Sequence, residues 1–251
     1  SLSIVHYPLF IVQMIECRNI YSHYSKALSR PILNGITLKI KQGESVVLLG
    51  LNGAGKSSLL KAMVGLLPLK QGEIRINELA MTPQTLRRIR RQIGVIWQGG
   101  GLISQLSALD NVLCGKLGSM SSWSSLWGFS KSDRRKAQTL LDQFGLEQHS
   151  GEKVKKLSGG QQQKVAISRA LMESPAILLA DEPTAGLDSV ATQQTVEILQ
   201  TLRQQGMTMV LVLHDLQIAR YCAERAIILN QGQVVYDGST DNLEEEYRKL
   251  C

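Results

Sequence analysis

Nearly continuous apolar runs alternate along the chain with segments whose apolar residues recur at helical spacing. The runs Ser45–Leu49, Ala176–Ala180 and Met207–Leu213 consist almost wholly of apolar residues, which is typical of strands in a parallel sheet covered on both faces. Lys56–Gly65 and Ser189–Gln205 place apolar residues three and four positions apart and predict helices. Strands alternating with helices predict an α/β domain with a largely parallel core.

The same patterns predict further elements and one region that lacks clear strands. No clear strand is predicted between Gly99 and about Ser150, where we expect a helical insertion that contains a helix over Ser132–Phe144. Further strands are expected from Ile15 onward and over Ile36–Ile40, Gly72–Asn77, Ile93–Trp97, Ala226–Asn230 and Gln233–Tyr236. A turn is expected at Gln42–Gly43, a helix over Asp215–Arg225, and a basic helix or loop over Thr85–Gln92.

Composition adds limits on the class of protein. The chain has 251 residues, 43% hydrophobic and 20% charged, which is ordinary for a globular protein. No stretch approaches the roughly 18 apolar residues of a membrane-spanning helix, and no basic region precedes the apolar run Ile11–Ile15, so we expect no secretory signal. The 4 cysteines lack the paired spacing of a zinc site or disulfide framework. Because the first methionine is Met14, we expect residues 1–13 to be an extension and residues 14–251 a single domain.

The net charge is +7, from 28 Lys and Arg against 21 Asp and Glu. Such an excess suits nucleotide phosphates, nucleic acid or an anionic membrane surface, and it does not choose among them. The choice therefore depends on local motifs.

A glycine-rich loop follows the apolar strand that ends at Leu49. It fits the pattern G-x-x-x-x-G-K-S/T and lies between a strand and a helix, the context in which backbone N–H groups cradle phosphates. Lys56 is predicted to bridge the β- and γ-phosphates and the Ser57 hydroxyl to hold Mg²⁺. A tight turn that happens to contain Lys and Ser is the alternative. The predicted nucleotide-binding residues of this loop are Gly50, Asn52, Gly53, Ala54, Gly55, Lys56, Ser57 and Ser58.

The apolar run Ala176–Ala180 ends in Asp181 and Glu182. Ligands of parallel α/β folds bind at the carboxyl ends of the strands, so both carboxylates should emerge beside the phosphate loop. Asp181 is a candidate Mg²⁺ ligand, since Mg²⁺ prefers hard oxygen ligands, and Glu182 is a candidate base that polarises the attacking water. Alternatively, the acidic pair only caps the next helix.

A second candidate anion site precedes the acidic strand. Ser158, Gly159, Gly160 and Gln161 open a helix, where exposed amides, a hydroxyl and the helix dipole favour an anion. A chain with one phosphate loop needs such a second site only if it closes over a nucleotide held by another subunit. An ordinary helix cap is the alternative.

With these residues the chain resembles the ATPase subunits of ABC transporters, whose signature sequence LSGGQ stands here at Leu157–Gln161. The resemblance covers nearly everything from Met14 onward, with the motifs in family order. It implies a P-loop NTPase fold with a RecA-like core, an N-terminal antiparallel β subdomain and a helical signature subdomain at about residues 99–170. It also implies ATP and Mg²⁺ as ligands.

The resemblance assigns roles to further residues. Gln98 matches the family glutamine that senses Mg²⁺ and the attacking water, and His214 matches the histidine that contacts the γ-phosphate. Asp188 matches the loop that crosses the dimer interface. Tyr24 aligns with the aromatic residue that stacks on adenine, although Tyr21 lies close by. Lys56, Gln98, Glu182 and His214 thus form the implied catalytic set, and Ser57, Gln98 and Asp181 the implied Mg²⁺ set.

Within the family, the segment after the glutamine is similar to that of phosphonate-importer ATPases. Gly115–Gly118 and Trp123–Leu126 fit the pattern of that subfamily, and so does the run Gln161–Gln163. Ala185–Leu187 and His214–Asp215 follow the generic importer pattern instead. Phosphonate or phosphite is therefore the first expectation for the cargo, and another small solute is the alternative.

The resemblance also implies partners and a location. We expect a homodimer at the cytoplasmic face of the cell membrane, bound peripherally to separate permease subunits that work with a periplasmic or extracellular solute-binding protein. We expect no nucleic-acid partner. A non-transport ABC ATPase that acts on nucleic acid through Arg87, Arg88, Arg90 and Arg91 remains an alternative, as does an inactive structural member.

Overall fold

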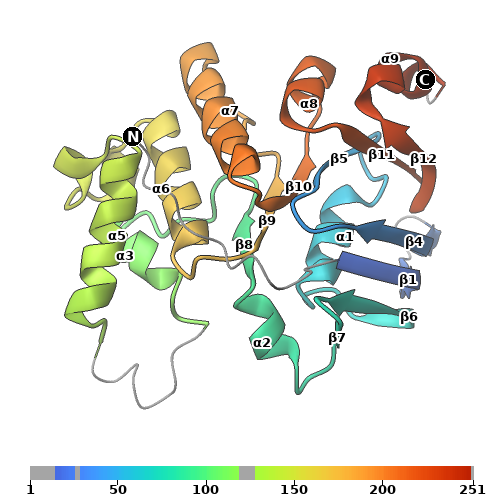
Figure 1. The fold of residues 1–251 in the computed structure, drawn as a ribbon, viewed down its shortest axis with the longest axis horizontal. Helices are drawn as coiled ribbons and strands as arrows, with labels where there is room; N and C mark the ends of the chain where they lie inside the picture. Colours follow the sequence, from blue (N-terminus) through green and yellow to red (C-terminus); the bar gives the residue numbers. More distant parts are fainter. Residues whose placement is uncertain (1–14, 26–28, 119–127, 250–251) are drawn as a thin grey trace.

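The computed structural model describes residues 15–25, 29–118 and 128–249, with N-terminal strands, a central sheet and a helical part (Figure 1). The expected extension over residues 1–13 and the segment Trp123–Leu126 lie outside the described residues. The division into one domain with a helical subdomain at about residues 99–170 stays a prediction.

The central sheet has 6 strands in the order β12-β11-β5-β10-β9-β8. Neighbours from β11 to β8 run parallel, and β12 is antiparallel to β11 at the edge. The predicted parallel core is therefore confirmed. The strands are β5 (Ser45–Leu49), β8 (Ile93–Ile96), β9 (Ile177–Asp181), β10 (Thr208–Val212), β11 (Arg225–Asn230) and β12 (Gln233–Ser239).

Alternate residues of the central strands enter two different hydrophobic clusters. Val46 and Leu48 of β5 pack with α1 and the N-terminal strands, whereas Val47 and Leu49 pack with α6, α7 and α8. Both faces of the sheet are thus covered, which explains why its strands are continuously apolar. The helices of these layers are α1 (Lys56–Met63), α6 (Gly159–Leu171), α7 (Ser189–Gln204) and α8 (Leu216–Cys222).

An antiparallel sheet, in the order β4-β1-β6-β7, covers α1 from the other side (Figure 1). Its strands are β1 (Ile15–Ser22), β4 (Asn34–Ile40), β6 (Leu69–Ile76) and β7 (Leu79–Ala80). The predicted turn at Gln42–Gly43 passes the chain from this sheet to the central one, and the Gly43 amide donates to Thr208 Oγ1 of β10 at 2.9 Å. The expected N-terminal antiparallel β subdomain is confirmed.

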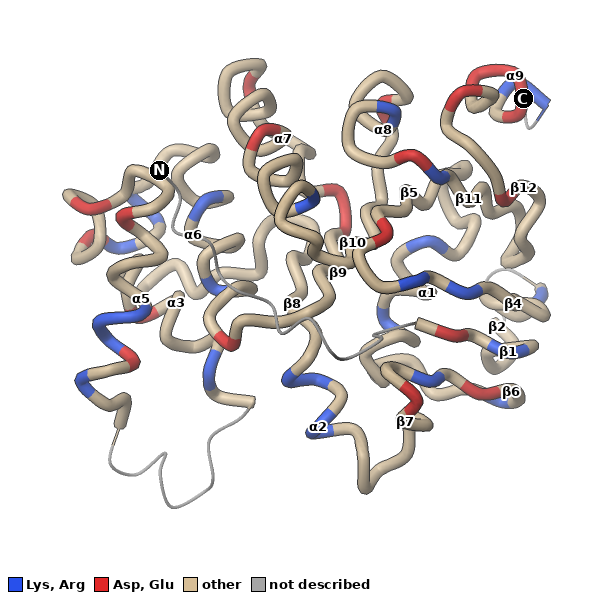
Figure 2. The backbone as a smooth tube through the Cα atoms, in the orientation of Figure 1, with Lys and Arg blue, Asp and Glu red and all other residues tan. Residues whose placement is uncertain are grey.

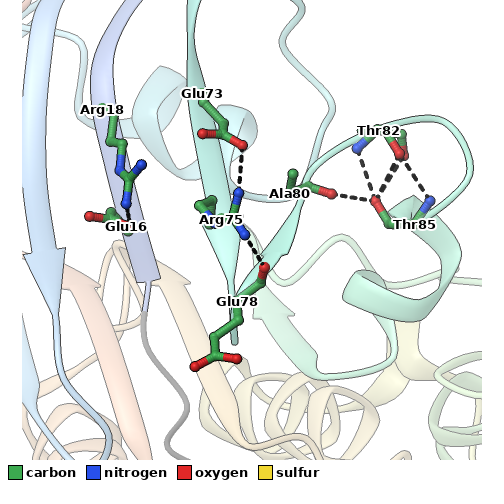
Figure 3. A network of polar contacts seen from close by, with 8 residues as sticks. All are labelled: Glu16, Arg18, Glu73, Arg75, Glu78, Ala80, Thr82 and Thr85. Atoms are coloured by element: carbon green, nitrogen blue, oxygen red, sulfur yellow. Dashed lines mark hydrogen bonds and ion pairs between the residues drawn. The ribbon is translucent and has the colours of Figure 1, made fainter.

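Polar contacts fix the corner between this sheet and α2 (Leu86–Arg90). Figure 3 shows Arg75 between Glu73, at 2.9 Å, and the Glu78 carbonyl oxygen, at 2.5 Å. The Thr85 hydroxyl donates to the Ala80 carbonyl oxygen at 2.5 Å, so the residue before α2 is bound to β7. The Thr85 bond ties the start of α2 to β7, and α2 packs beside β8.

Among the described residues, the expected helical insertion contains α3 (Ala108–Cys114) and α5 (Lys131–Gln143), which pack on α6 (Figure 1). Ser130 begins α5 with a capping box, because its hydroxyl accepts from the Asp133 amide and the Asp133 carboxylate accepts from the Ser130 amide. This reciprocal pair explains why the helix starts just before the predicted Ser132.

One predicted helix is too long. The helix expected over Asp215–Arg225 ends at Cys222, because Ala223 is extended, with φ −151°. Arg225 belongs to β11, where its guanidinium pairs with Asp237 at 2.6 Å and Glu44 at 2.8 Å. The short strands β2 (Tyr24–Ser25), β3 (Arg30–Pro31) and β7, and the C-terminal helix α9 (Leu243–Arg248), were not predicted.

Candidate nucleotide-binding and hydrolysis site

The phosphate loop turns sharply between β5 and α1. Gly50 has φ +141°, and a β-carbon there would collide with the Leu229 carbonyl oxygen of the neighbouring strand. Gly55 caps α1 with φ +108°, a conformation that L side chains rarely adopt. Glycine is therefore required at both ends of the loop, and its amides can point toward one ligand.

Lys56 lies at the first turn of α1 and is 6% exposed. Its ammonium group donates to the carbonyl oxygens of Gly50, at 2.7 Å, and Leu51, at 3.1 Å. Burial lowers the pKa of Lys56, while the charges of Glu182 and Asp181 oppose that change. The loop thus holds a desolvated cation close to two carboxylates, ready to receive an anionic group.

Asp181 is the last residue of β9, and it is 5% exposed. Its Oδ1 accepts a hydrogen bond of 3.0 Å from the Ser57 hydroxyl. Burial raises the pKa of Asp181, and the Ser57 hydrogen bond lowers it in part. Burial makes the negative charge on this carboxylate unfavourable, so a nearby cation would stabilise it. The carboxylate and hydroxyl oxygens together are the kind of donors that a hard divalent cation such as Mg²⁺ prefers.

Glu182 is held between two side chains from the segments that follow the neighbouring strands β8 and β10. Its Oε2 accepts from Gln98 Nε2 at 2.8 Å, and its Oε1 lies 2.7 Å from His214 Nε2. Because β8, β9 and β10 are parallel neighbours, the residues that follow their carboxyl ends meet at one edge. The predicted catalytic residues Gln98, Glu182 and His214 are therefore brought together beside Asp181.

The backbone at Glu182 is strained. Its φ is +50°, although it is not glycine, and its amide donates to the Val212 carbonyl oxygen at 3.1 Å. A non-glycine residue in this region costs on the order of 1 to 3 kcal/mol, and such residues cluster at functional sites. In this backbone conformation the carboxylate lies between Gln98 and His214. The sequence motif gives no sign of the positive φ.

A short hairpin lies against the phosphate loop. Arg30 of β3 donates to the Gly53 carbonyl oxygen at 3.1 Å, and β3 pairs with β2, which carries Tyr24. Tyr24 is 61% exposed, so its ring is available for stacking. Tyr21 instead packs its hydroxyl over Gly35, so the geometry favours Tyr24. Sequence reasoning missed Arg30, because no motif marks it.

The signature residues form a separate cluster. Ser158 and Gln161 make a capping box at the start of α6, and Gln161 also contacts His149 at 3.0 Å. Gly160 packs so closely on Ala191 that a β-carbon there would lie 2.7 Å from the alanine methyl. Asp188 caps α7 by accepting from the Ala191 amide at 2.8 Å. The described hydrogen bonds of this cluster are local and do not join it to Lys56.

Comparisons with known proteins define the class. A family model described as ABC transporter matches residues 33–185. The chain belongs to the ABC transporter family, among its ATP-binding, ATP-hydrolysing subunits.

Two relatives and one solved structure refine the comparison. The chain is 59% identical to phosphonates import ATP-binding protein PhnC 2 of Nostoc sp. and 58% identical to PhnC of Trichormus variabilis, in both cases over 93% of this chain and 96% of the relative. The dimeric post-hydrolysis structure of the ATP-binding cassette MJ0796, bound to ADP and Pi, has 34% identity and a TM-score of 0.76 and covers 90% of this chain and 98% of its own.

We predict that Asp181→Asn separates stability from nucleotide binding. Because the pKa of Asp181 is raised, its negative charge lowers the stability of the fold at neutral pH; this cost shrinks as pH falls through the raised pKa and is absent below the ordinary carboxyl pKa. The variant without ligand should therefore melt at the wild-type temperature or above it at pH 7. Its thermal shift on adding MgATP should be lost.

The control is Asp142→Asn, at an exposed residue of α5. It should melt at the wild-type temperature both without ligand and with MgATP. An Asp181→Asn protein that melts well below wild type without ligand, yet keeps the full MgATP shift, would contradict the assignment.

Proposed function

We propose that this chain powers the import of phosphonate or phosphite-like anions by hydrolysing ATP for a separate permease. The 59% identity to a phosphonates import ATP-binding protein over nearly the whole of both chains carries the proposal for the cargo. The patterns at Gly115–Gly118 and Trp123–Leu126 support it. Import of another small solute is the alternative.

The observation that carries ATP hydrolysis is Glu182, held by Gln98 and His214 at the end of β9. The triphosphate of ATP would lie on the loop amides and Lys56, with adenine against Tyr24. Glu182 would accept a proton from water as the water oxygen attacks the γ-phosphorus and the bond to the β-phosphate oxygen breaks. Gln98 would orient the carboxylate and the water, and His214 would support the γ-phosphate.

Ser57, Asp181 and Gln98 are the residues that would hold Mg²⁺. When bound, the ion neutralises charge on the phosphate oxygens. The buried Asp181 carboxylate and its hydroxyl neighbour support this assignment, because both present oxygen atoms in a site where a negative charge is otherwise costly.

The separate signature cluster supports a shared site in a homodimer. In our proposal, Ser158, Gly159 and Gly160 of one copy close over the nucleotide held by the phosphate loop of its partner. Asp188 begins α7 beside this cluster and would lie at the same interface. The dimeric cassette among the similar structures supports this arrangement for the family.

A groove of about 390 Å³ near Gln98 is our candidate permease contact. It lies between β8, α3 and the end of α6 and is lined by Trp97, Gly101, Cys114 and Arg169, among others. In the part of the chain that the structure describes, no helix is long and apolar enough to cross a bilayer. We propose peripheral attachment at the cytoplasmic membrane face, with a solute-binding protein acting through the permease.

The arginines of α2 are the feature that a nucleic-acid partner could use, and Figure 2 shows α2 as a largely basic segment. Arg90, however, donates to the carbonyl oxygens of Val64, at 2.9 Å, and Gly65, at 3.2 Å. This arginine therefore serves the fold. Salt-dependent binding of nucleic acid by the purified protein would favour that alternative function.

We predict that a strain lacking this gene fails to grow on methylphosphonate as the sole phosphorus source but grows on phosphate. The wild-type gene should restore growth and uptake of labelled methylphosphonate, and the Lys56→Ala gene should not, because the protein could no longer bind the phosphates. Unimpaired methylphosphonate uptake in the deletion strain, where no second copy of such an importer exists, would refute the cargo.

We predict that two inactive variants restore ATP hydrolysis when mixed. Lys56→Ala removes the phosphate contact, and Ser158→Arg blocks the signature. A mixed dimer contains one intact site, formed by the loop of the Ser158→Arg copy and the signature of the Lys56→Ala copy. Phosphate release should therefore appear on mixing.

The matched control mixes Lys56→Ala with the double variant Lys56→Ala/Ser158→Arg, in which every possible site lacks Lys56. It should stay inactive. Full hydrolysis by Ser158→Arg alone would show that the signature is not part of the site.

A further inference from the structure

The segment after Gln98 has an unusual backbone. Gly99, Gly100 and Gly101 all have positive φ values, of +70°, +72° and +58°. A run of glycines in this region is flexible in itself, because glycine restricts the backbone least. The turn closes with a bond from the Gly100 amide to the Trp97 carbonyl oxygen at 2.8 Å. This turn follows Gln98 directly in the chain, and Gln98 lies two residues after the end of β8.

One side chain from α6 holds this turn. Arg169 donates from Nη1 to the Gly101 carbonyl oxygen at 2.7 Å and from Nη2 to the Gly100 carbonyl oxygen at 2.6 Å. The planar guanidinium offers its donors in a rigid fork, so two bonds to successive carbonyl groups fix both the place and the orientation of the turn. Lysine has a single compact ammonium group and cannot reproduce this geometry.

The backbone that carries Arg169 is itself tightly placed. A β-carbon at Gly115 of the α3 end would collide with the Arg169 carbonyl oxygen, and one at Gly94 of β8 would lie 2.5 Å from the Ala170 carbonyl oxygen. The end of α6 is therefore in close contact with both α3 and β8. Burial lowers the pKa of the Arg169 guanidinium, and its bonds to the two carbonyl groups compensate for part of its lost hydration.

We propose that Arg169 is a positioning residue for ATP hydrolysis, which fixes the Gly99–Gly101 turn so that Gln98 keeps its 2.8 Å hydrogen bond to Glu182. Since the signature residue Ser158 caps the start of α6, the helix that would close over the partner's nucleotide also holds the turn after the glutamine of its own site. The inference rests on the proposed roles of Gln98 and Glu182 and is independent of the cargo.

The first test compares steady-state ATP hydrolysis by wild type, Arg169→Ala and Arg169→Lys. Arg169→Ala should lower kcat by about tenfold to 100-fold, since a small misplacement of a catalytic group costs rate on that scale. KM for MgATP should stay within about twofold of wild type, because Lys56 and the loop amides are untouched. Arg169→Lys should restore little of the rate. Arg135→Ala, at an exposed residue of α5, is the control.

A double-mutant cycle separates positioning from a merely structural role. If Arg169 acts through Gln98, Arg169→Ala should not lower kcat further in a Gln98→Ala background. An equal loss in both backgrounds would overturn the proposal, and so would wild-type kcat in Arg169→Ala. Wild-type turnover in Gln98→Ala alone would instead refute the proposed role of Gln98, so the two failures are distinguishable.

Tryptophan fluorescence gives a readout that does not depend on turnover. It also tests the proposal through Arg169→Lys if Arg169→Ala folds poorly. A β-carbon at Gly101 would lie 3.8 Å from the Trp97 ring, so this turn lies against the indole. With Trp123 and Trp127 replaced by Phe, Trp97 is the sole tryptophan. Arg169→Lys should shift its emission at an unchanged melting temperature. An unchanged Trp97 emission spectrum would show that the Gly99–Gly101 turn stays in place without the Arg169 guanidinium, which would contradict the proposal.

Discussion

The structure of the site depends on two adjacent carboxylates at the end of the buried strand β9. Asp181 is almost fully buried, and Glu182 has a strained backbone with φ +50°. Negative charge in such a place is costly unless partners compensate it. Each neighbouring element supplies one: α1 gives Ser57, the segment after β8 gives Gln98, and the segment after β10 gives His214. The parallel sheet places these partners at one edge.

In our proposal, the site of one copy is incomplete without its partner. Lys56 and the two carboxylates lie on the core side, whereas Ser158 and Asp188 form their own locally bonded cluster on α6 and α7. A second copy that supplies its signature would complete the nucleotide site. Arg169 connects the two regions within one chain, since it lies on the signature helix and holds the turn that follows Gln98.

Much of this could be predicted from sequence, because the chemistry lies in short contiguous motifs. The phosphate loop, the acidic end of β9 and the capping box of α6 each carry their signal within a few residues. What escaped prediction depends on contacts between distant residues. Arg30 meets Gly53 across 23 positions and Arg169 meets Gly101 across 68, and no local pattern encodes such pairs.

The central claim is that Glu182 serves as the base, and Glu182→Gln tests it most directly, because glutamine keeps the shape but cannot accept the proton. We predict wild-type affinity for MgATP, a stable ATP-bound dimer in size-exclusion chromatography, and a loss of phosphate release of about 100-fold or more. Glu245→Gln, at an exposed residue of α9, should behave as wild type. Turnover by Glu182→Gln at the wild-type rate would contradict the account.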